Sequence, residues 1–189
     1  MPLKIVQTGE RVLRENARRL SIEEIRGDSI QQAIEAMKET MYAAPGVGLA
    51  APQVGLALQL AVIEDKPDYT KDISAEALAA RGRRPVPFHV IINPRIVEQR
   101  GQAGDFFEGC LSVAGFSAVV PRALNIVVEC LNEKAEPVRI QADGWYARIL
   151  QHEIDHLNGI LYIDRMITRS FTTMENFNHY WKDGPAKSW

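Results

Sequence analysis

The chain has 189 residues, of which 46% are hydrophobic and 24% are charged, as is ordinary for one globular domain with a real core. Its net charge of −2 gives no electrostatic reason to expect nucleic-acid binding, and no hydrophobic run approaches the roughly 18 residues of a membrane-spanning helix. The N-terminus, MPLKIVQTGERVL, lacks the features of a signal or transit peptide. We therefore expect a single cytoplasmic domain over residues 1–189, with a processed organellar form as the alternative.

The first clear element along the chain is a helix. Residues 1–27 have little periodicity and are expected to be irregular, whereas apolar residues recur at helical spacing over 28–44. Asp28 and Gln31 resemble a capping box at its start, and Pro45 ends it.

A segment of small residues follows, GVGLAAPQ at 46–53. It can be interpreted as a phosphate-binding loop, but no G-x-x-G follows it and no strand precedes it. Alternatively, its small side chains let the backbone approach a ligand or a metal closely. Gln53 is then either a buried polar group that needs a partner or an exposed residue in a turn.

The middle of the chain reads mainly as strands. Strands are predicted at 58–64, 88–93, 95–100, 118–120, 125–131 and 136–141, with a surface excursion at 65–87 that contains a short helix at 74–80, a loop at 101–107 and a hairpin turn at 132–135. The tail, 168–189, is aromatic without a clear period, and either packs along the surface or serves a partner. Strands followed by one helix, without strand–helix alternation, favour the α+β class.

That helix, predicted over 145–159, contains the pattern H-E-x-x-H in His152–His156. Residues four apart lie on one helix face, so both imidazoles can bind the same metal ion. Glu153 can then take a proton from a water bound to that ion and deliver it to a leaving group. Asp143 is the expected N-cap and Gly159 the expected terminator.

A metal held by two histidines needs a third protein ligand. The candidates are His89, His179, the carboxylates and Cys110. We favour Cys110, because it follows a glycine in a loop and a thiolate is a strong donor. Cys130 lies in an apolar strand and is expected in the core, and His89 is expected to be structural. A Cys-His-His set leaves a fourth position for water, as in catalytic sites.

Three segments together resemble peptide deformylase: GVGLAAPQ at 46–53, EGCLS at 108–112 and QHEIDHLNG at 151–159. They occur in the family's order and spacing. The resemblance implies an α+β fold with antiparallel β-sheets around the helix that bears H-E-x-x-H. It also implies removal of the N-formyl group from the formylmethionine of nascent polypeptides, with release of formate.

The resemblance assigns roles to residues of this chain. Cys110, His152 and His156 would bind one divalent metal, expected to be Fe(II), with Zn, Ni or Co as substitutes. Glu153 would be the general acid and base, while Gln53 and the backbone N–H of Leu111 would stabilise the oxyanion. Substrate contacts are expected from Val47, Gly48, Gly109, Trp145 and Ile149. Transient ribosome association is a family-level expectation, and neither nucleic-acid binding nor membrane association is expected.

Some features differ from the commonest bacterial pattern. Pro45 stands where an acidic residue is frequent, and the run at 112–122 resembles the subgroup that includes mitochondrial-type enzymes. Arg148 lies one turn before His152; it either reaches a substrate carbonyl or extends its guanidinium outward to solvent, and we favour the second. Asp155 either supports the ligands or is a solvated helix residue, and again we favour the second.

Two other functions fit parts of the sequence. A zincin-like metallopeptidase shares H-E-x-x-H but needs a third ligand downstream of the helix, and no typical peptidase motif frames His179. A binding module that has lost activity would keep the fold, but all the expected ligands are present here.

Overall fold

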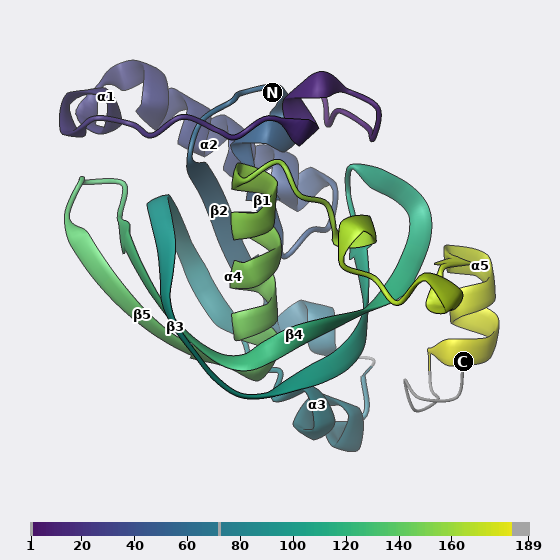
Figure 1. Cartoon of the computed structure of the whole chain (residues 1–189). Helices are drawn as coiled ribbons and strands as arrows, with labels where there is room; N and C mark the ends of the chain where they lie inside the picture. The colour runs from purple at the N-terminus through teal and green to yellow at the C-terminus, as the bar shows by residue number, and fades with distance from the viewer. Residues whose placement is uncertain (1, 72, 183–189) are drawn as a thin grey trace.

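The computed structural model describes residues 2–71 and 73–182, which form one curved antiparallel sheet with helices on both of its faces. Strands β1 to β5 pair in chain order, β6 pairs with β4, and each of these pairings is antiparallel. In Figure 1, helix α4 lies in the concave side of the sheet. The α+β class is confirmed, although the strands described form one continuous sheet rather than several.

The strands are β1 Gly48–Ala50, β2 Leu60–Asp65, β3 Val86–Cys110, β4 Val113–Leu131, β5 Pro137–Asp143 and β6 Thr172–Thr173. The helices are α1 Ile22–Arg26, α2 Asp28–Ala43, α3 Ala75–Arg81, α4 Gly144–Leu157 and α5 Met174–Asn176, with a π-helical turn at Phe177–Trp181. Short 3-10 helices lie at Arg11–Arg14, Ala51–Val54, Pro67–Thr70, Tyr162–Asp164 and Thr168–Ser170. None of the helices described is long and apolar enough to cross a membrane.

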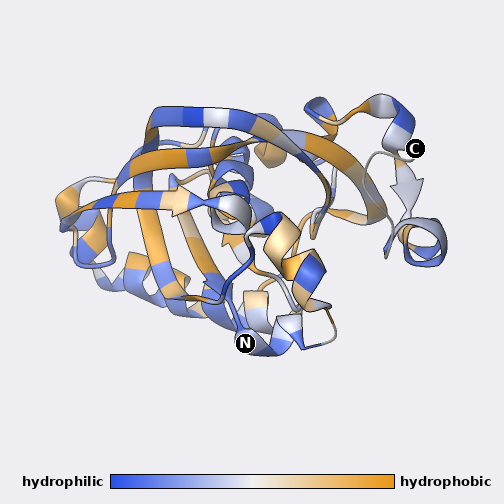
Figure 2. Cartoon of the chain, turned by 90° about the horizontal axis from the view of Figure 1, so that it is seen from below, coloured by the Kyte–Doolittle hydropathy of each residue, from blue (hydrophilic) through white to orange (hydrophobic). Residues whose placement is uncertain are grey.

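Strand β2 is buried on both faces, which explains its nearly continuous run of apolar residues. Ala61 and Ile63 belong to the apolar cluster around α4, whereas Leu60 and Val62 belong to the cluster around α2. The hydropathy colours of Figure 2 show hydrophobic stretches along the strands that lie between these layers. The alternation of side chains along a strand thus serves two cores at once.

Helix α4 is buried almost all round, since ten of its 14 residues are buried. Its end follows the prediction: Gly159 has φ +69°, a left-handed conformation that glycine adopts without strain. Its start does not. Asp143 occupies the N-cap position without a capping hydrogen bond, because its carboxylate binds Arg84 at 2.6 Å. The polar residues inside α4 must find partners within the protein.

The N-terminal region is more ordered than predicted. Residues 1–27 contain α1, which starts with a capping box formed by Ser21 and Glu24. The S-x-x-E signal for this box was present in the sequence. The capping box predicted at Asp28 and Gln31 does not form, because the Gln31 amide donates instead to the carbonyls of Ile25 at 2.7 Å and Glu133 at 2.9 Å.

The prediction of a loop at 101–107 is also wrong, because strand β3 continues through these residues. These residues pair with β4, for example Ala103 with Ala123 and Phe107 with Val119. The pairing register shifts between Arg100 and Ala103, next to Gly101 at φ +80°. A long-range partner strand and a bulge therefore override a composition typical of loops.

The remaining short elements follow the prediction in part. The helix expected at 74–80 is α3, and the Ser74 hydroxyl accepts a hydrogen bond from Ala77 N at 3.2 Å. The tail folds back on the sheet as β6, α5 and the π-helical turn, while its last residues, 183–189, lie outside the part of the chain described.

We predict that Gly159→Ala is more destabilising than Gly55→Ala. Both glycines have positive φ, but a Cβ at Gly159 would lie 2.7 Å from the Arg14 backbone, whereas at Gly55 it meets nothing within 4 Å. Gly55→Ala should cost about 1 kcal/mol of unfolding free energy through backbone strain alone, and Gly159→Ala at least ~1 kcal/mol more. Urea titrations of both variants measure the difference. Equal losses would mean that the contact with Arg14 relaxes freely.

Candidate metal centre

Three predicted metal ligands come together where the end of β3 meets α4. The ligand atoms of Cys110, His152 and His156 all lie within 4.8 Å of one another, and Cys110 Sγ is 3.3 Å from His156 Nε2. Cys110 is the last residue of β3, and it pairs with Val113 across a two-residue turn. One thiolate and two imidazoles form a donor set that suits a transition metal.

The other candidate ligands have different surroundings. His89 contacts the carbonyl of Pro87 and the hydroxyl of Tyr146, each at 2.9 Å. His179 lies on the π-helical turn, and neither histidine belongs to a metal-ligand cluster among residues 2–71 and 73–182. Cys130 packs in the core around α4, where burial raises the pKa of its thiol to about 11.

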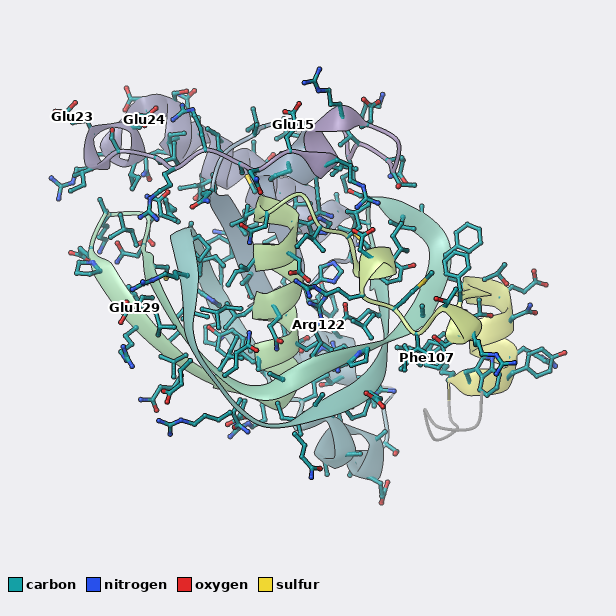
Figure 3. All side chains as sticks on the ribbon, in the orientation of Figure 1. Glu15, Glu23, Glu24, Phe107, Arg122 and Glu129 are labelled. Atoms are coloured by element: carbon teal, nitrogen blue, oxygen red, sulfur yellow. The ribbon has the colours of Figure 1, made fainter. Side chains whose placement is uncertain are left out.

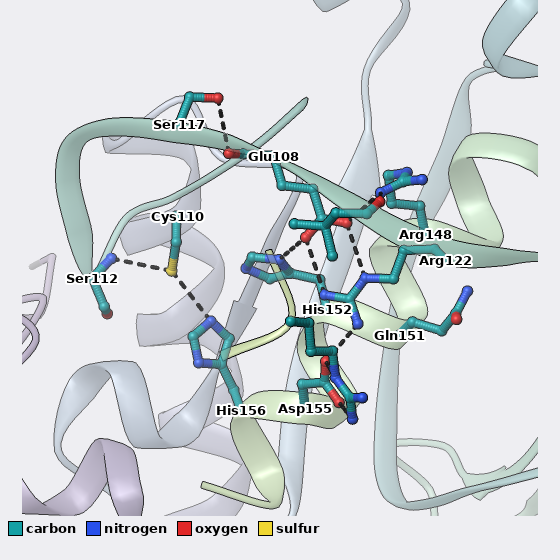
Figure 4. A network of polar contacts seen from close by, with 12 residues as sticks. Glu108, Cys110, Ser112, Ser117, Arg122, Arg148, Gln151, His152, Asp155 and His156 are labelled. Carbon is teal, nitrogen blue, oxygen red and sulfur yellow. Dashed lines mark hydrogen bonds and ion pairs between the residues drawn. The ribbon is translucent and has the colours of Figure 1, made fainter. Parts of the chain in front are cut away.

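Glu108 connects the ligand histidine to the interior of the protein. Its Oε2 lies 2.9 Å from His152 Nδ1, so the other ring nitrogen of His152 is left to face Cys110. Arg122 donates to both carboxylate oxygens, at 2.9 and 3.0 Å, and Arg148 donates to Oε1 at 2.6 Å. Figure 4 shows these side chains meeting around the Glu108 carboxylate. A carboxylate that receives the second nitrogen of a ligand histidine fixes the orientation of its ring.

The structure contradicts both interpretations that we favoured for Arg148 and Asp155. The Arg148 guanidinium does not extend to solvent: the residue is 3% exposed and donates also to the carbonyls of Val120 at 2.7 Å and Gly104 at 2.6 Å. Asp155 is not solvated, since it is buried and binds Arg122 at 2.5 Å and Arg165 at 2.6 Å. Arg148 contacts Glu108, which in turn contacts the candidate ligand His152, and Asp155 joins the same network through Arg122. Because α4 is enclosed, its charged side chains pair inside the protein.

The two histidines of the cluster differ in their electrostatic surroundings. Burial alone would lower the pKa of His152, but Cys110 and Glu108 raise it well above its usual value. Burial opposes the ionisation of Glu108, but hydrogen bonds from His152 and Arg122 outweigh it and hold its pKa below the usual range. Burial, with His152 and Arg122, lowers the pKa of His156, so that ring stays neutral and able to donate a lone pair. These residues fit a divalent metal.

Glu153 lies beside the cluster, against a residue that has no side chain. A Cβ at Gly48 would lie 2.2 Å from Glu153 Oε1, so the backbone of β1 leaves just enough room for the carboxylate. Glu153 Oε2 is buried without a hydrogen-bond partner among the described residues. Burial raises the pKa of Glu153 to about 7, and a bound cation would oppose this shift. An orphaned carboxylate oxygen of this kind is suited to exchange a proton with a ligand.

Gln53 is buried, so the alternative of an exposed turn residue is wrong. Its Oε1 accepts from Ala50 N at 2.9 Å, and this bond fixes the direction of the amide. Its Nε2 points at Cys110 Sγ at 3.5 Å and at Ser112 Oγ at 3.3 Å. Leu111 lies in the turn after Cys110, and its carbonyl accepts from Gln7 at 2.9 Å. Both residues predicted to stabilise an oxyanion therefore lie beside Cys110.

A cleft of about 560 Å³ opens beside Cys110, His152 and Glu153. Its wall also includes all five residues predicted to contact substrate, Val47, Gly48, Gly109, Trp145 and Ile149. Glu108 and Arg148 line it as well, and Arg122 lies behind Glu108; none of these three was among the predicted site residues. The sequence offers one signal for Glu108, which is its position two residues before the predicted ligand Cys110. No nearby sequence feature indicates a role for Arg122.

Most of this chain is similar in sequence to known proteins. The sequence model described as "Polypeptide deformylase" matches residues 2–171. The chloroplastic peptide deformylase 1A of Solanum lycopersicum is 46% identical over 174 residues, which are 92% of this chain and 63% of that protein. The mitochondrial peptide deformylase of Homo sapiens is 37% identical over 177 residues, 94% of this chain and 71% of its own length. This chain thus spans less than two thirds of the plant relative.

Solved structures agree in fold. The crystal structure of a class I type b peptide deformylase from Acinetobacter baumannii, bound to Met-Ala-Ser, has a TM-score of 0.78 and 32% identity to this chain. The match covers 88% of this chain and 99% of that one.

We predict that Glu108→Gln weakens divalent metal binding by about 10- to 100-fold, because the neutral amide no longer fixes His152 Nδ1 with a charge. Glu129→Gln is the matched control: Glu129 lies on β4 and also pairs with two arginines, Arg95 at 3.1 Å and Arg139 at 2.5 Å, but it is partly exposed and does not line the cleft. Competitive titration with a chelator measures both affinities. Unchanged affinity in a folded Glu108→Gln protein would contradict the role of Glu108.

Proposed function

Because the chain belongs to the peptide deformylase family, we propose that it hydrolyses the N-formyl group of formylmethionyl polypeptides, giving formate and a free α-amine. The observation that carries this proposal is the placement of Cys110, His152 and His156 beside the free carboxylate oxygen of Glu153, all at one cleft. The related Acinetobacter enzyme binds Met-Ala-Ser, a peptide with the free methionine amine of a product. We extend that substrate class to this chain.

In this proposal, Cys110, His152 and His156 hold one divalent metal, Fe(II) in the native protein, with Zn, Ni or Co as substitutes. When bound, the metal supplies Lewis acidity and lowers the pKa of water. Glu153 takes a proton from the attacking water through Oε2 and passes it to the departing amine. The Gln53 amide and the Leu111 N–H donate to the formyl oxygen as it gains negative charge, a contribution commonly worth about 3–4 kcal/mol per donor.

The remaining residues of the site orient the His152 ring and the substrate. Glu108, held by Arg122 and Arg148, keeps the His152 ring in one orientation. Val47, Gly48, Gly109, Trp145 and Ile149 are proposed to hold the methionine and the start of the peptide backbone. We further propose that residues 1–189 work as one metallohydrolase domain, cytoplasmic, with nascent chains as substrate and with transient ribosome contact.

The test is formate release from formyl-Met-Ala-Ser by anaerobically purified, Fe(II)-loaded protein, with unformylated peptide as the control. Formate should disappear on chelation and return with metal. Glu153→Gln should keep its metal and lose about 10²- to 10⁴-fold in kcat, the usual contribution of a general acid–base group. Glu23→Gln, an exposed change on α1, should match the native rate. A metal-loaded protein that releases no formate would contradict the proposal and favour an inactive binding module.

The metallopeptidase alternative is tested at Cys110. Under the deformylase proposal, Cys110→Ser removes one of three protein ligands, and bound metal should fall from about one per chain to a small fraction after dialysis. Cys130→Ala, in the core, should keep its metal. Retention of a full equivalent of metal by Cys110→Ser, together with cleavage of internal peptide bonds, would support the peptidase instead.

A further inference from the structure

The C-terminal segment, defined here as residues 172–181, lies beyond the part of the chain that the family model matches, residues 2–171. It is nevertheless fixed to the sheet. β6 pairs with β4, with Phe116 opposite Thr173 and Ser117 opposite Thr172. Just before it, the buried Ser170 hydroxyl accepts from Val119 N at 2.8 Å. These bonds set the position of the segment relative to the β3–β4 hairpin.

Aromatic contacts hold the far end of the segment. The Phe107 ring on β3 lies 5.0 Å from the Phe177 ring and 6.3 Å from the Trp181 ring, measured between centroids. In Figure 3, Phe107 lies between the sheet and the C-terminal helical turns. Phe116 is stacked on Phe171 at 4.9 Å. Packed aromatic pairs of this kind restrict movement of the segment on the hairpin.

Met174, the first residue of α5, lines the same cleft as Cys110 and Glu153. Phe107 and Phe116, which contact the C-terminal region through Phe177 and Phe171, line it too. Met174 is 37% exposed and Phe116 is 39% exposed, so both present apolar surface that no part of the described chain covers. Exposed apolar surface next to a binding cleft is typical of a ligand contact.

We propose that Met174 and Phe116 form an apolar subsite for a side chain that follows the formylmethionine, and that this subsite makes the enzyme prefer large apolar residues there. The inference rests on the proposed deformylase function. The occupant is the substrate peptide, because Met174 and Phe116 line the same cleft as Cys110, His152 and Glu153. The unbranched thioether side chain of Met174 adapts to apolar partners of different shape. The subsite therefore prefers large apolar side chains as a class and not one particular residue.

The experiment compares kcat/KM for formyl-Met-Leu-Leu and formyl-Met-Ser-Ser, using the full-length metal-loaded protein. Met174→Asp should lower the leucine-to-serine ratio by about five- to tenfold. The aspartate removes about half of the apolar surface that a substrate leucine would bury in the subsite, and it places a charge there. Tyr180→Asp is the matched control: Tyr180 lies in the same segment, is 65% exposed and does not line the cleft. It should leave the ratio unchanged. Met174→Ala, which should lower the ratio less, serves if Met174→Asp does not fold.

The outcomes separate the two proposals. No formate from either peptide with the native protein would overturn the function itself. Native turnover with a ratio unchanged in folded Met174→Asp and Met174→Ala would overturn only the subsite. An unchanged ratio accompanied by loss of a dimer in sedimentation would assign the apolar surface to a second copy of this chain, which also overturns the proposal. An equal fall in the ratio for Tyr180→Asp would mean that the added charge acts at a distance and not by loss of an apolar contact, which also overturns the subsite.

Discussion

The buried carboxylate of Glu108 joins the sheet, the helix and the candidate metal centre. It stands two residues before Cys110 on β3, accepts from Arg122 of β4 and from Arg148 of α4, and contacts the ring of His152. A carboxylate at 6% exposure would be very unfavourable alone, so it is tolerated only when these partners are all in place. The two buried arginines in turn balance Glu108 and Asp155, which leaves this group of four side chains formally neutral. The geometry around His152 therefore depends on the pairing of β3 with β4 and on the packing of α4 against both strands.

The sequence was sufficient for those features whose chemistry is local. H-E-x-x-H requires only a helix for His152 and His156 to share a face, and a helix is what α4 provides. Cys110 was selected as the third ligand from its residue type and its place after a glycine, and its sulfur lies next to His156 Nε2. The class of fold followed from the order of strands and helix.

What could not be predicted depends on burial by distant segments. Arg148 and Asp155 have the composition of an exposed helix face, and only the enclosure of α4 by the curved sheet turns them into buried ion pairs. The segment 101–107 has the composition of a loop, yet β4 supplies a partner strand from Ala103 onward. The missed helix α1 is different, since its capping box was visible in Ser21 and Glu24, and only its short length hid it.

The position of Met174 in the cleft wall also bears on how the molecule matures during translation. Chains leave the ribosome N-terminus first, at about 5–20 residues per second, and the residues around the candidate metal centre extend from Val47 to His156. Met174, by contrast, follows His156 in the chain and emerges after all of these residues. A partly synthesised chain that has just exposed α4 therefore has its metal-ligand side chains but an unfinished cleft. Emergence of the segment that contains Met174, rather than assembly of the candidate ligands, is the event that gives the cleft its final shape.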